Sequence, residues 1–120
     1  MPRVVAFLAD GFEEVEAITP VDYLRRAGID VVTVGVGTGK PIGARGMQVV
    51  ADLEIESLHG IPDGVILPGG MPGASNLAAS EKVAEITRNV MKNGGLVGSI
   101  CAAPALALGS FGLLKNRLFT

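Results

Sequence analysis

The sequence has few of the residues that build covalent cross-links and metal sites. It contains one cysteine and one histidine in 120 residues, which excludes an intrachain disulfide and a zinc cluster of Cys and His ligands. A long hydrophobic run is also missing at the start, where the apolar run before Asp10 has only six residues. We therefore expect no secretory leader and no membrane span there, and we expect the lone thiol to reside in a reducing cytoplasm.

A strong charge of either sign is absent as well. Lys and Arg number 10 and Asp and Glu number 12, which gives a formal net charge of −2. This balance, without a basic run, argues against binding to nucleic acid or to an anionic membrane. Gly and Pro are frequent, yet 48% hydrophobic residues exclude a disordered low-complexity chain. We expect a single folded domain over residues 1–120, with small molecules or proteins as partners.

Short, continuous apolar runs are the main pattern in the chain. They cover residues 4–9, 31–36, 65–67 and 96–100. Such runs are typical of strands that are buried on both faces of a parallel sheet. Between the first two runs, Thr19 and Pro20 predict the start of a helix that Gly28 ends. Between the last two, Ser80 predicts the N-cap of a helix that continues to Asn93, so the sequence predicts a doubly wound α/β fold.

Two glycine-rich segments need separate interpretations. Gly43 and Gly46 indicate turns within residues 42–53, where we expect an antiparallel excursion from the sheet. Residues 35–41 resemble a phosphate-binding loop only superficially, because Pro41 stands where the motif requires a hydroxyl. We therefore expect no nucleotide cofactor and no metal ion.

The lone cysteine follows an apolar strand and precedes a run of small residues. Small residues on both sides of Cys101 permit the sharp strand-to-helix turn that presents a nucleophile. Backbone N–H groups and the positive end of the helix dipole would stabilise a thiolate there. The alternative is a small cysteine in the core. His59 lies next to Gly60 in a predicted loop, and we expect it at the surface rather than as a base for Cys101.

Three glutamates follow the first strand. If this segment is helical, Phe12, Val15 and Glu16 share an apolar face, whereas Glu13 and Glu14 point away as solvated charges. The alternative for Glu16 is an edge carboxylate that reaches water.

If Glu16 and Cys101 lie close together, the protonation state of each depends on the other. The first strand and the strand before Cys101 are expected to end at the same carboxyl edge of the sheet, where ligand sites of α/β proteins lie. Two unit charges ~4 Å apart repel by about 4 kcal/mol at an effective dielectric of 20. The pair would then hold one proton, most simply as a protonated carboxyl beside a thiolate.

A second candidate feature is the glycine pair after the strand over residues 65–67. Glycine allows a close approach of backbone to ligand, so the N–H of Gly69 or Gly70 is a candidate oxyanion donor alongside the N–H of Ala102. The alternative is a tight turn with no further role.

Together these segments resemble the ThiJ/PfpI superfamily, and most closely its branch with the parkinsonism-associated protein deglycase and bacterial YajL. The matching segments are GFEEVE (11–16), PVDYLRRAG (20–28), LPGG (67–70) with NL (76–77), and SICAAP (99–104). The resemblance implies a flavodoxin-like α/β sandwich, like that of the class I glutamine amidotransferases, and usually a homodimer.

The resemblance also implies roles for individual residues. Cys101 matches the cysteine of the nucleophile elbow, and Glu16 matches the carboxyl that hydrogen-bonds it. Gly70 and Ala102 match the backbone donors. No cofactor is implied.

The resemblance has further implications for the dimer and for the chain length. Arg26 and Arg45 match arginines that approach the site across the dimer interface. Family members continue past residue 120 and place a histidine there, after a strand that begins at Leu118. We therefore expect this chain to hold about the N-terminal two thirds of the usual length, with the remaining strands supplied by a second polypeptide if the domain is nicked.

Three functions fit these residues. The first is a deglycase or glyoxalase in which Cys101 attacks glyoxal, methylglyoxal or their adducts on proteins and nucleotides, which would protect against oxidative stress. The second is a redox sensor or chaperone in which Cys101 is oxidised to a sulfinate. The third and weakest is an amidotransferase or peptidase, which would need a Cys-His-Glu triad and would leave Glu16 unexplained.

Overall fold

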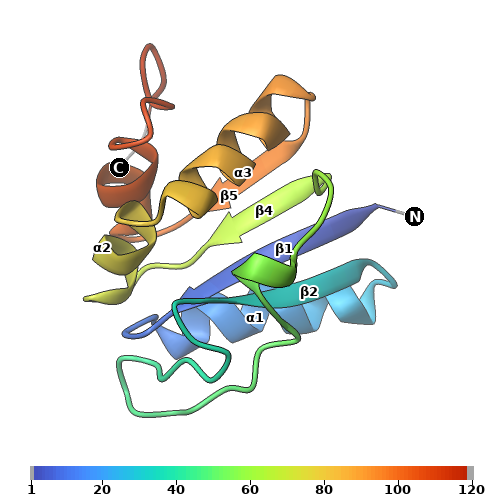
Figure 1. Ribbon diagram of the computed structural model, residues 1–120, viewed down its shortest axis with the longest axis vertical. Coiled ribbons are helices and arrows are strands. Elements are labelled where there is room, and N and C mark those ends of the chain that lie inside the picture. The colour runs from blue at the N-terminus through green and yellow to red at the C-terminus, as the bar shows by residue number, and fades with distance from the viewer. Residues whose placement is uncertain (1, 119–120) are drawn as a thin grey trace.

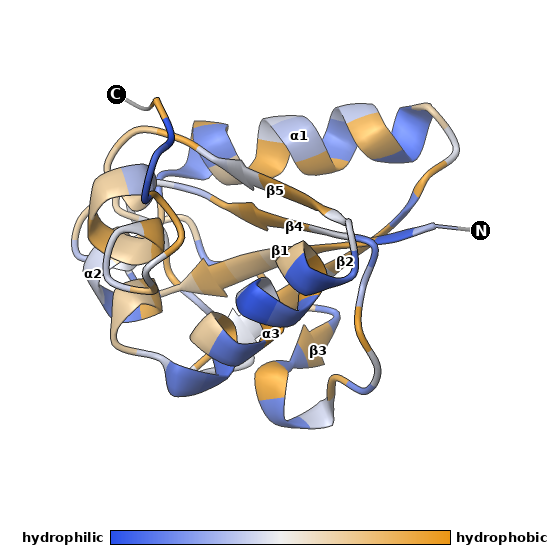
Figure 2. Ribbon diagram, turned by 90° about the horizontal axis from the view of Figure 1, so that it is seen from above, coloured by the Kyte–Doolittle hydropathy of each residue, from blue (hydrophilic) through white to orange (hydrophobic). Residues whose placement is uncertain are grey.

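The computed structural model describes residues 2–118. Five parallel strands form one sheet in the order β3-β2-β1-β4-β5. The strands are β1 (Arg3–Ala9), β2 (Asp30–Val36), β3 (Leu53–Glu54), β4 (Gly64–Leu67) and β5 (Leu96–Ser99). Helix α1 (Glu14–Arg26) covers one face, and α2 (Gly73–Ala78) and α3 (Glu81–Lys92) cover the other (Figures 1 and 2). The predicted doubly wound α/β fold is confirmed.

The central strand explains why the apolar runs are continuous. Alternate residues of β1 point to opposite faces of the sheet. Phe7 packs in the cluster that includes side chains of α2 and α3, whereas Leu8 packs with Phe12 and with Ala17 of α1. Both Phe7 and Leu8 are fully buried. Because both faces of β1 are covered, neither face tolerates polar residues, and β1 and β4 are mostly orange in Figure 2.

Helix α1 begins six residues earlier than the sequence predicts. It starts at Glu14, so Pro20 lies inside the helix instead of opening it. Pro20 lacks an N–H and costs the helix one hydrogen bond. The turn before it forms nevertheless, because Ala17 is fully buried against the sheet and its N–H donates to the carbonyl of Glu13. The predicted end is confirmed, since Gly28 follows the last turn with a φ of +83°.

Helix α3 matches its prediction closely. The Ser80 hydroxyl accepts a hydrogen bond from the Val83 N–H at 3.2 Å, which confirms Ser80 as the N-cap. Val83, Thr87 and Val90 are fully buried on the face toward the sheet. The helix ends before Gly94, which has a φ of +75°.

The predicted antiparallel excursion is also present. Ile42 and Gln48 form an isolated antiparallel bridge, and the N–H of Val49 donates to the carbonyl of Pro41 at 3.0 Å. The short 3-10 helix η1 (Ile55–Ser57) follows β3 and leads to β4.

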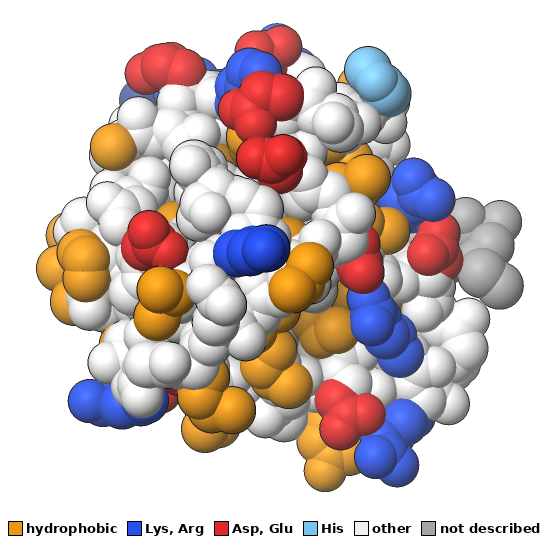
Figure 3. All heavy atoms as spheres, turned by 60° about the horizontal axis from the view of Figure 1, so that its bottom comes forward, with side chains coloured by type: hydrophobic (Ala, Val, Ile, Leu, Met, Phe, Trp, Pro, Cys, Tyr) orange, Lys and Arg blue, Asp and Glu red, His pale blue; other side chains and the backbone are white. Residues whose placement is uncertain are grey.

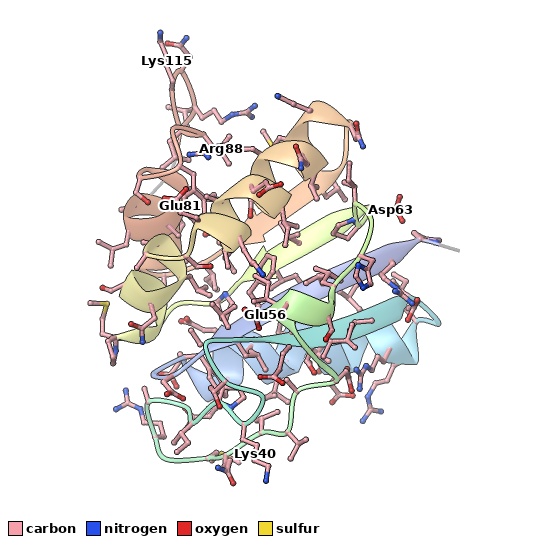
Figure 4. All side chains as sticks on the ribbon, in the orientation of Figure 1. Lys40, Glu56, Asp63, Glu81, Arg88 and Lys115 are labelled. Carbon is pink, nitrogen blue, oxygen red and sulfur yellow. The ribbon has the colours of Figure 1, made fainter. Side chains whose placement is uncertain are left out.

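The segment after β5 packs against α3. It contains the π-helix η2 (Pro104–Leu108) and then a turn. The Arg88 guanidinium of α3 donates to the Phe111 carbonyl at 3.1 Å, and Figure 4 shows Arg88 on the side of α3 next to this segment. Of the strand predicted over residues 118–120, Leu118 lies in no strand, and residues 119–120 lie outside the described part of the chain. Within residues 2–118, no helix is long and apolar enough to cross a membrane.

Candidate functional site

Cys101 occupies a sharp turn directly after β5. Its φ is +61°, a left-handed conformation that costs a non-glycine residue about 1–2 kcal/mol. Its side chain is exposed. The N–H of Ala103 donates to the carbonyl of Ile100 at 3.1 Å and closes the turn. The strand-to-helix turn is therefore as predicted, but the helix that follows is a π-helix of only five residues, so it offers the thiol no long helix dipole.

The loop after β4 brings Glu16 and Cys101 together. The Gly69 N–H donates to Glu16 Oε1 at 3.0 Å. A Cβ added to Gly69 would lie 2.6 Å from Glu16 Oε1 and 2.7 Å from Cys101 Cβ. Both side chains thus pack on the same glycine, which no larger residue can replace without displacing them. Strand β4 lies between β1 and β5, so the contact is made through its loop rather than between neighbouring strands.

Two expectations around Glu16 are wrong. Phe12 precedes the helix and is buried, whereas Val15 is 70% exposed, so these residues do not share an apolar face. The Gly69 N–H is already bound by Glu16, so it is not an available oxyanion donor. Because α1 begins at Glu14, its register turns Val15 outward and directs Glu16 toward the loop after β4.

Gly70 and Ala102 are the other two predicted backbone donors. Gly70 has a φ of +93°, and a Cβ there would lie 2.4 Å from the Glu13 nitrogen. Within residues 2–118, the N–H groups of Gly70 and Ala102 donate to no protein acceptor. They are therefore free to donate hydrogen bonds to an oxygen that enters the site.

Sequence reasoning missed the role of Glu14, which is not a solvated charge. The residue is 6% exposed, and its carboxylate accepts the N–H groups of Arg45 and Met47 at 2.9–3.1 Å. Burial opposes its charge, but the N–H groups of Met47, Glu14 itself and Arg45, together with the Arg45 cation, hold its pKa below the ordinary value. No local signal could have shown this contact, because its partners lie more than thirty residues away.

The two arginines of the predicted site occupy different places. Arg45 Nη2 lies 3.4 Å from Glu13 Oε2, and the Glu13 N–H donates to the Gly69 carbonyl at 2.9 Å, which links Arg45 to the loop near Cys101. Arg26 lies in the last turn of α1, where it pairs with Asp22 at 2.7 Å. Within the chain, the structure does not bring Arg26 to Cys101.

Cys101 opens onto a mainly apolar hollow of about 670 Å³. Val97, Ser99, Ile100, Pro104, Leu108, Leu114 and Leu118 line it with Cys101. A second hollow of about 440 Å³ lies on the α1 side, and Glu16 lines it with apolar side chains. Ser99 and Ile100 border both hollows.

His59 is exposed in the loop before β4, as predicted. Residues 2–118 contain no cluster of His, Cys, Asp and Glu that could hold a metal ion.

The chain is similar to curated proteins along most of its length. It is 39% identical to the Parkinson disease protein 7 homolog of Danio rerio, with 88% of this chain and 58% of that protein covered. It is 36% identical to the glutathione-independent glyoxalase DJR-1.2 of Caenorhabditis elegans, with 88% and 56% covered. The chain thus spans less than two thirds of the length of these relatives.

Solved structures show the same similarity, and a family model matches almost the whole chain. A cysteine-to-alanine variant of a DJ-1 superfamily protein from Salmonella typhimurium has a TM-score of 0.92 and 39% identity, with 98% of this chain and 64% of that chain covered. The oxidized DJ-1 of Toxoplasma gondii has a TM-score of 0.93 and 35% identity, with 97% and 64% covered. The DJ-1/PfpI family model matches residues 2–120. The chain therefore belongs to the DJ-1/PfpI family.

Proposed function

We propose that this domain acts as a cysteine-dependent enzyme of the glyoxalase or deglycase type on small carbonyl compounds or their adducts. The observation that carries the proposal is the exposed Cys101 at a φ of +61°, with Glu16 packed on the same glycine. Backbone strain at a nucleophile is a recurrent feature of active sites. Similarity to the Caenorhabditis elegans glyoxalase adds support from an independent direction.

In the proposed reaction, Cys101, Glu16 and two backbone N–H groups have separate roles. The Cys101 thiolate adds to the aldehyde carbon of a 2-oxoaldehyde, and the carbonyl electron pair moves to the oxygen. The N–H groups of Gly70 and Ala102 stabilise that oxygen, and the Glu16 carboxyl supplies its proton. In the hemithioacetal that results, the hydrogen on C1 leaves as a proton and is returned to C2 through an enediol, which gives the thioester of a 2-hydroxy acid on Cys101. Water hydrolyses this thioester, which releases the 2-hydroxy acid and frees the thiol. The overall reaction adds one water molecule without net oxidation and needs no cofactor.

We also propose that the active form is a homodimer in the cytoplasm. An apolar patch is exposed on α1 and on the loop before β3, and its members are Val15, Ile18, Ile42, Met47 and Val50. Figure 3 shows hydrophobic side chains among charged ones on this side of the molecule. A second copy would cover this patch and bring further arginines toward the site. An exposed, unpaired thiol also fits a reducing compartment.

Turnover of methylglyoxal, followed by NMR detection of lactate, tests the catalytic proposal. Cys101→Ala is expected to abolish turnover while the circular dichroism spectrum stays that of the wild type, and Glu16→Gln is expected to lower kcat. Turnover that persists in Cys101→Ala would refute the proposal.

The same cysteine supports a second function, as a redox sensor or chaperone. One of the solved relatives, from Toxoplasma gondii, is oxidized. Mild peroxide would then add two oxygen atoms to Cys101 alone, with the sulfinate held by Glu16 and nearby N–H groups. Selective oxidation in a chain without turnover would favour this function over the enzyme.

A further inference from the structure

The turn between α3 and β5 contains an asparagine followed by two glycines. It lies at the amino end of β5 and at the periphery of the molecule (Figure 1). Asn93 is the residue that ends α3, and both Asn93 and Gly94 are exposed. The side-chain amide of Asn93 is therefore open to water and lies next to a backbone nitrogen that carries no neighbouring Cβ.

An asparagine in this setting can react with its own backbone. The Gly94 nitrogen loses its proton and attacks the side-chain carbonyl carbon of Asn93, and the bond from that carbon to the side-chain nitrogen breaks. Ammonia leaves with the proton, and a five-membered succinimide ring remains. Water then opens the ring at either carbonyl, which gives aspartate or isoaspartate. The net change is hydrolysis of one amide, so the reaction needs no oxidant, reductant or cofactor.

The native hydrogen bonds of this turn slow the reaction but do not prevent it. The Gly94 N–H donates to the Met91 carbonyl at 3.1 Å, and the Gly95 N–H donates to the Val90 carbonyl at 2.9 Å. The first of these bonds must break before the Gly94 nitrogen can attack. Helix ends fray, and such local opening costs much less free energy than unfolding of the domain. The native chain therefore reacts through local opening of the end of α3.

The other three asparagines are less suited to this reaction. Asn76, Asn89 and Asn116 precede Leu, Val and Arg, whose side chains shield the backbone nitrogen that would attack. The Asn76 amide also donates to the Asp10 carbonyl at 2.8 Å, which holds it away from its own backbone. Asn89 lies inside α3, where the backbone is fixed on both sides. Reaction is therefore expected at Asn93 first.

The two products differ in their effect on β5. Aspartate keeps the backbone of asparagine, whereas isoaspartate adds one methylene to the main chain. The residues that follow have no room for this insertion, because a Cβ added to Gly95 would lie 2.5 Å from the Asp63 carbonyl oxygen. The Leu96 N–H donates to the same oxygen at 3.0 Å, and Leu96 pairs with Gly64 at the start of β5. The extra methylene must displace the first residues of β5, the strand that leads to Cys101.

We propose that the Asn93–Gly94 bond is the site of spontaneous deamidation in the native domain, and that isoaspartate at this position, unlike aspartate, loosens β5. The proposal concerns a covalent modification of the turn and does not depend on the catalytic function of Cys101.

Peptide mass spectrometry of the intact chain aged in native buffer tests the site. Deamidation adds one mass unit, so isomerisation at the Asp10–Gly11 and Asp63–Gly64 pairs, which leaves the mass unchanged, does not interfere. We expect the modified fraction to grow about tenfold faster at Asn93 than at any other asparagine, and about tenfold slower than at Asn93 in concentrated urea, where the turn is open. Asn93→Gln is the matched control and should keep its mass. An unmodified Asn93 in native buffer, or equal rates at another asparagine, would overturn the proposed site.

Pulse proteolysis of the aged protein over a urea series tests the effect on β5. Electron-transfer fragmentation distinguishes isoaspartate from aspartate in the protein that survives each pulse. We expect the isoaspartate form to be lost at a lower urea concentration than the aspartate form and than Asn93→Asp. All three carry the same charge at the end of α3, so a difference reports on the backbone insertion alone. Equal survival of the isoaspartate and aspartate forms would contradict the loosening of β5.

Discussion

Gly69→Ala tests whether the packing of Glu16 and Cys101 on one glycine determines the site. The added Cβ would lie 2.6 Å from Glu16 Oε1 and 2.7 Å from Cys101 Cβ, whereas ordinary contacts begin at 3.4 Å. One or both side chains must therefore move by 0.8 Å or 0.7 Å. A shift of that size breaks the 3.0 Å hydrogen bond from Gly69 to Glu16.

We expect two measurable effects. Overpacking and the lost hydrogen bond should lower the free energy of unfolding by about 2 kcal/mol, measured by urea denaturation. Displacement of the reacting groups by nearly 1 Å should lower kcat/KM for methylglyoxal by about a hundredfold. Gly98→Ala is the stability control, because its Cβ would meet nothing closer than the Val65 carbonyl at 3.8 Å. Wild-type stability and turnover in Gly69→Ala would refute the reasoning.

Three further changes have defined outcomes. The pKa of Glu14 lies below its ordinary value of 4.5, so the stability that its carboxylate contributes is complete above that pH and is lost as the pH falls through the folded-state pKa. The difference in free energy of unfolding between the wild type and Glu14→Gln should therefore be smaller at strongly acidic pH than at neutral pH. Urea titrations at the two pH values measure this difference. Thr87→Val should stabilise the chain by about 1 kcal/mol in the same assay, since the buried hydroxyl has no partner within residues 2–118; a marked loss would contradict this. Ser80→Ala should cost about 1 kcal/mol through loss of the cap of α3, and an unchanged unfolding midpoint would refute that role.

The sequence by itself determined the layers of the fold and the turn that carries the cysteine. Continuous apolar runs require strands covered on both faces, and the buried alternation of Phe7 and Leu8 shows why. Ser80 and Gly94 bound α3 through local chemistry alone, namely a side-chain cap and a positive φ. Small residues around Cys101 likewise predicted its sharp turn.

Only the tertiary structure decided the start of α1 and the contacts of its glutamates. Local preference placed the helix start at Pro20, but burial of Ala17 against the sheet outweighs the hydrogen bond that Pro20 removes. With that register, Glu14 enters a loop some thirty residues away and Glu16 reaches the N–H of Gly69, which lies 53 residues along the chain. Such contacts depend on which segments the sheet brings together, and no local spacing of residues specifies them.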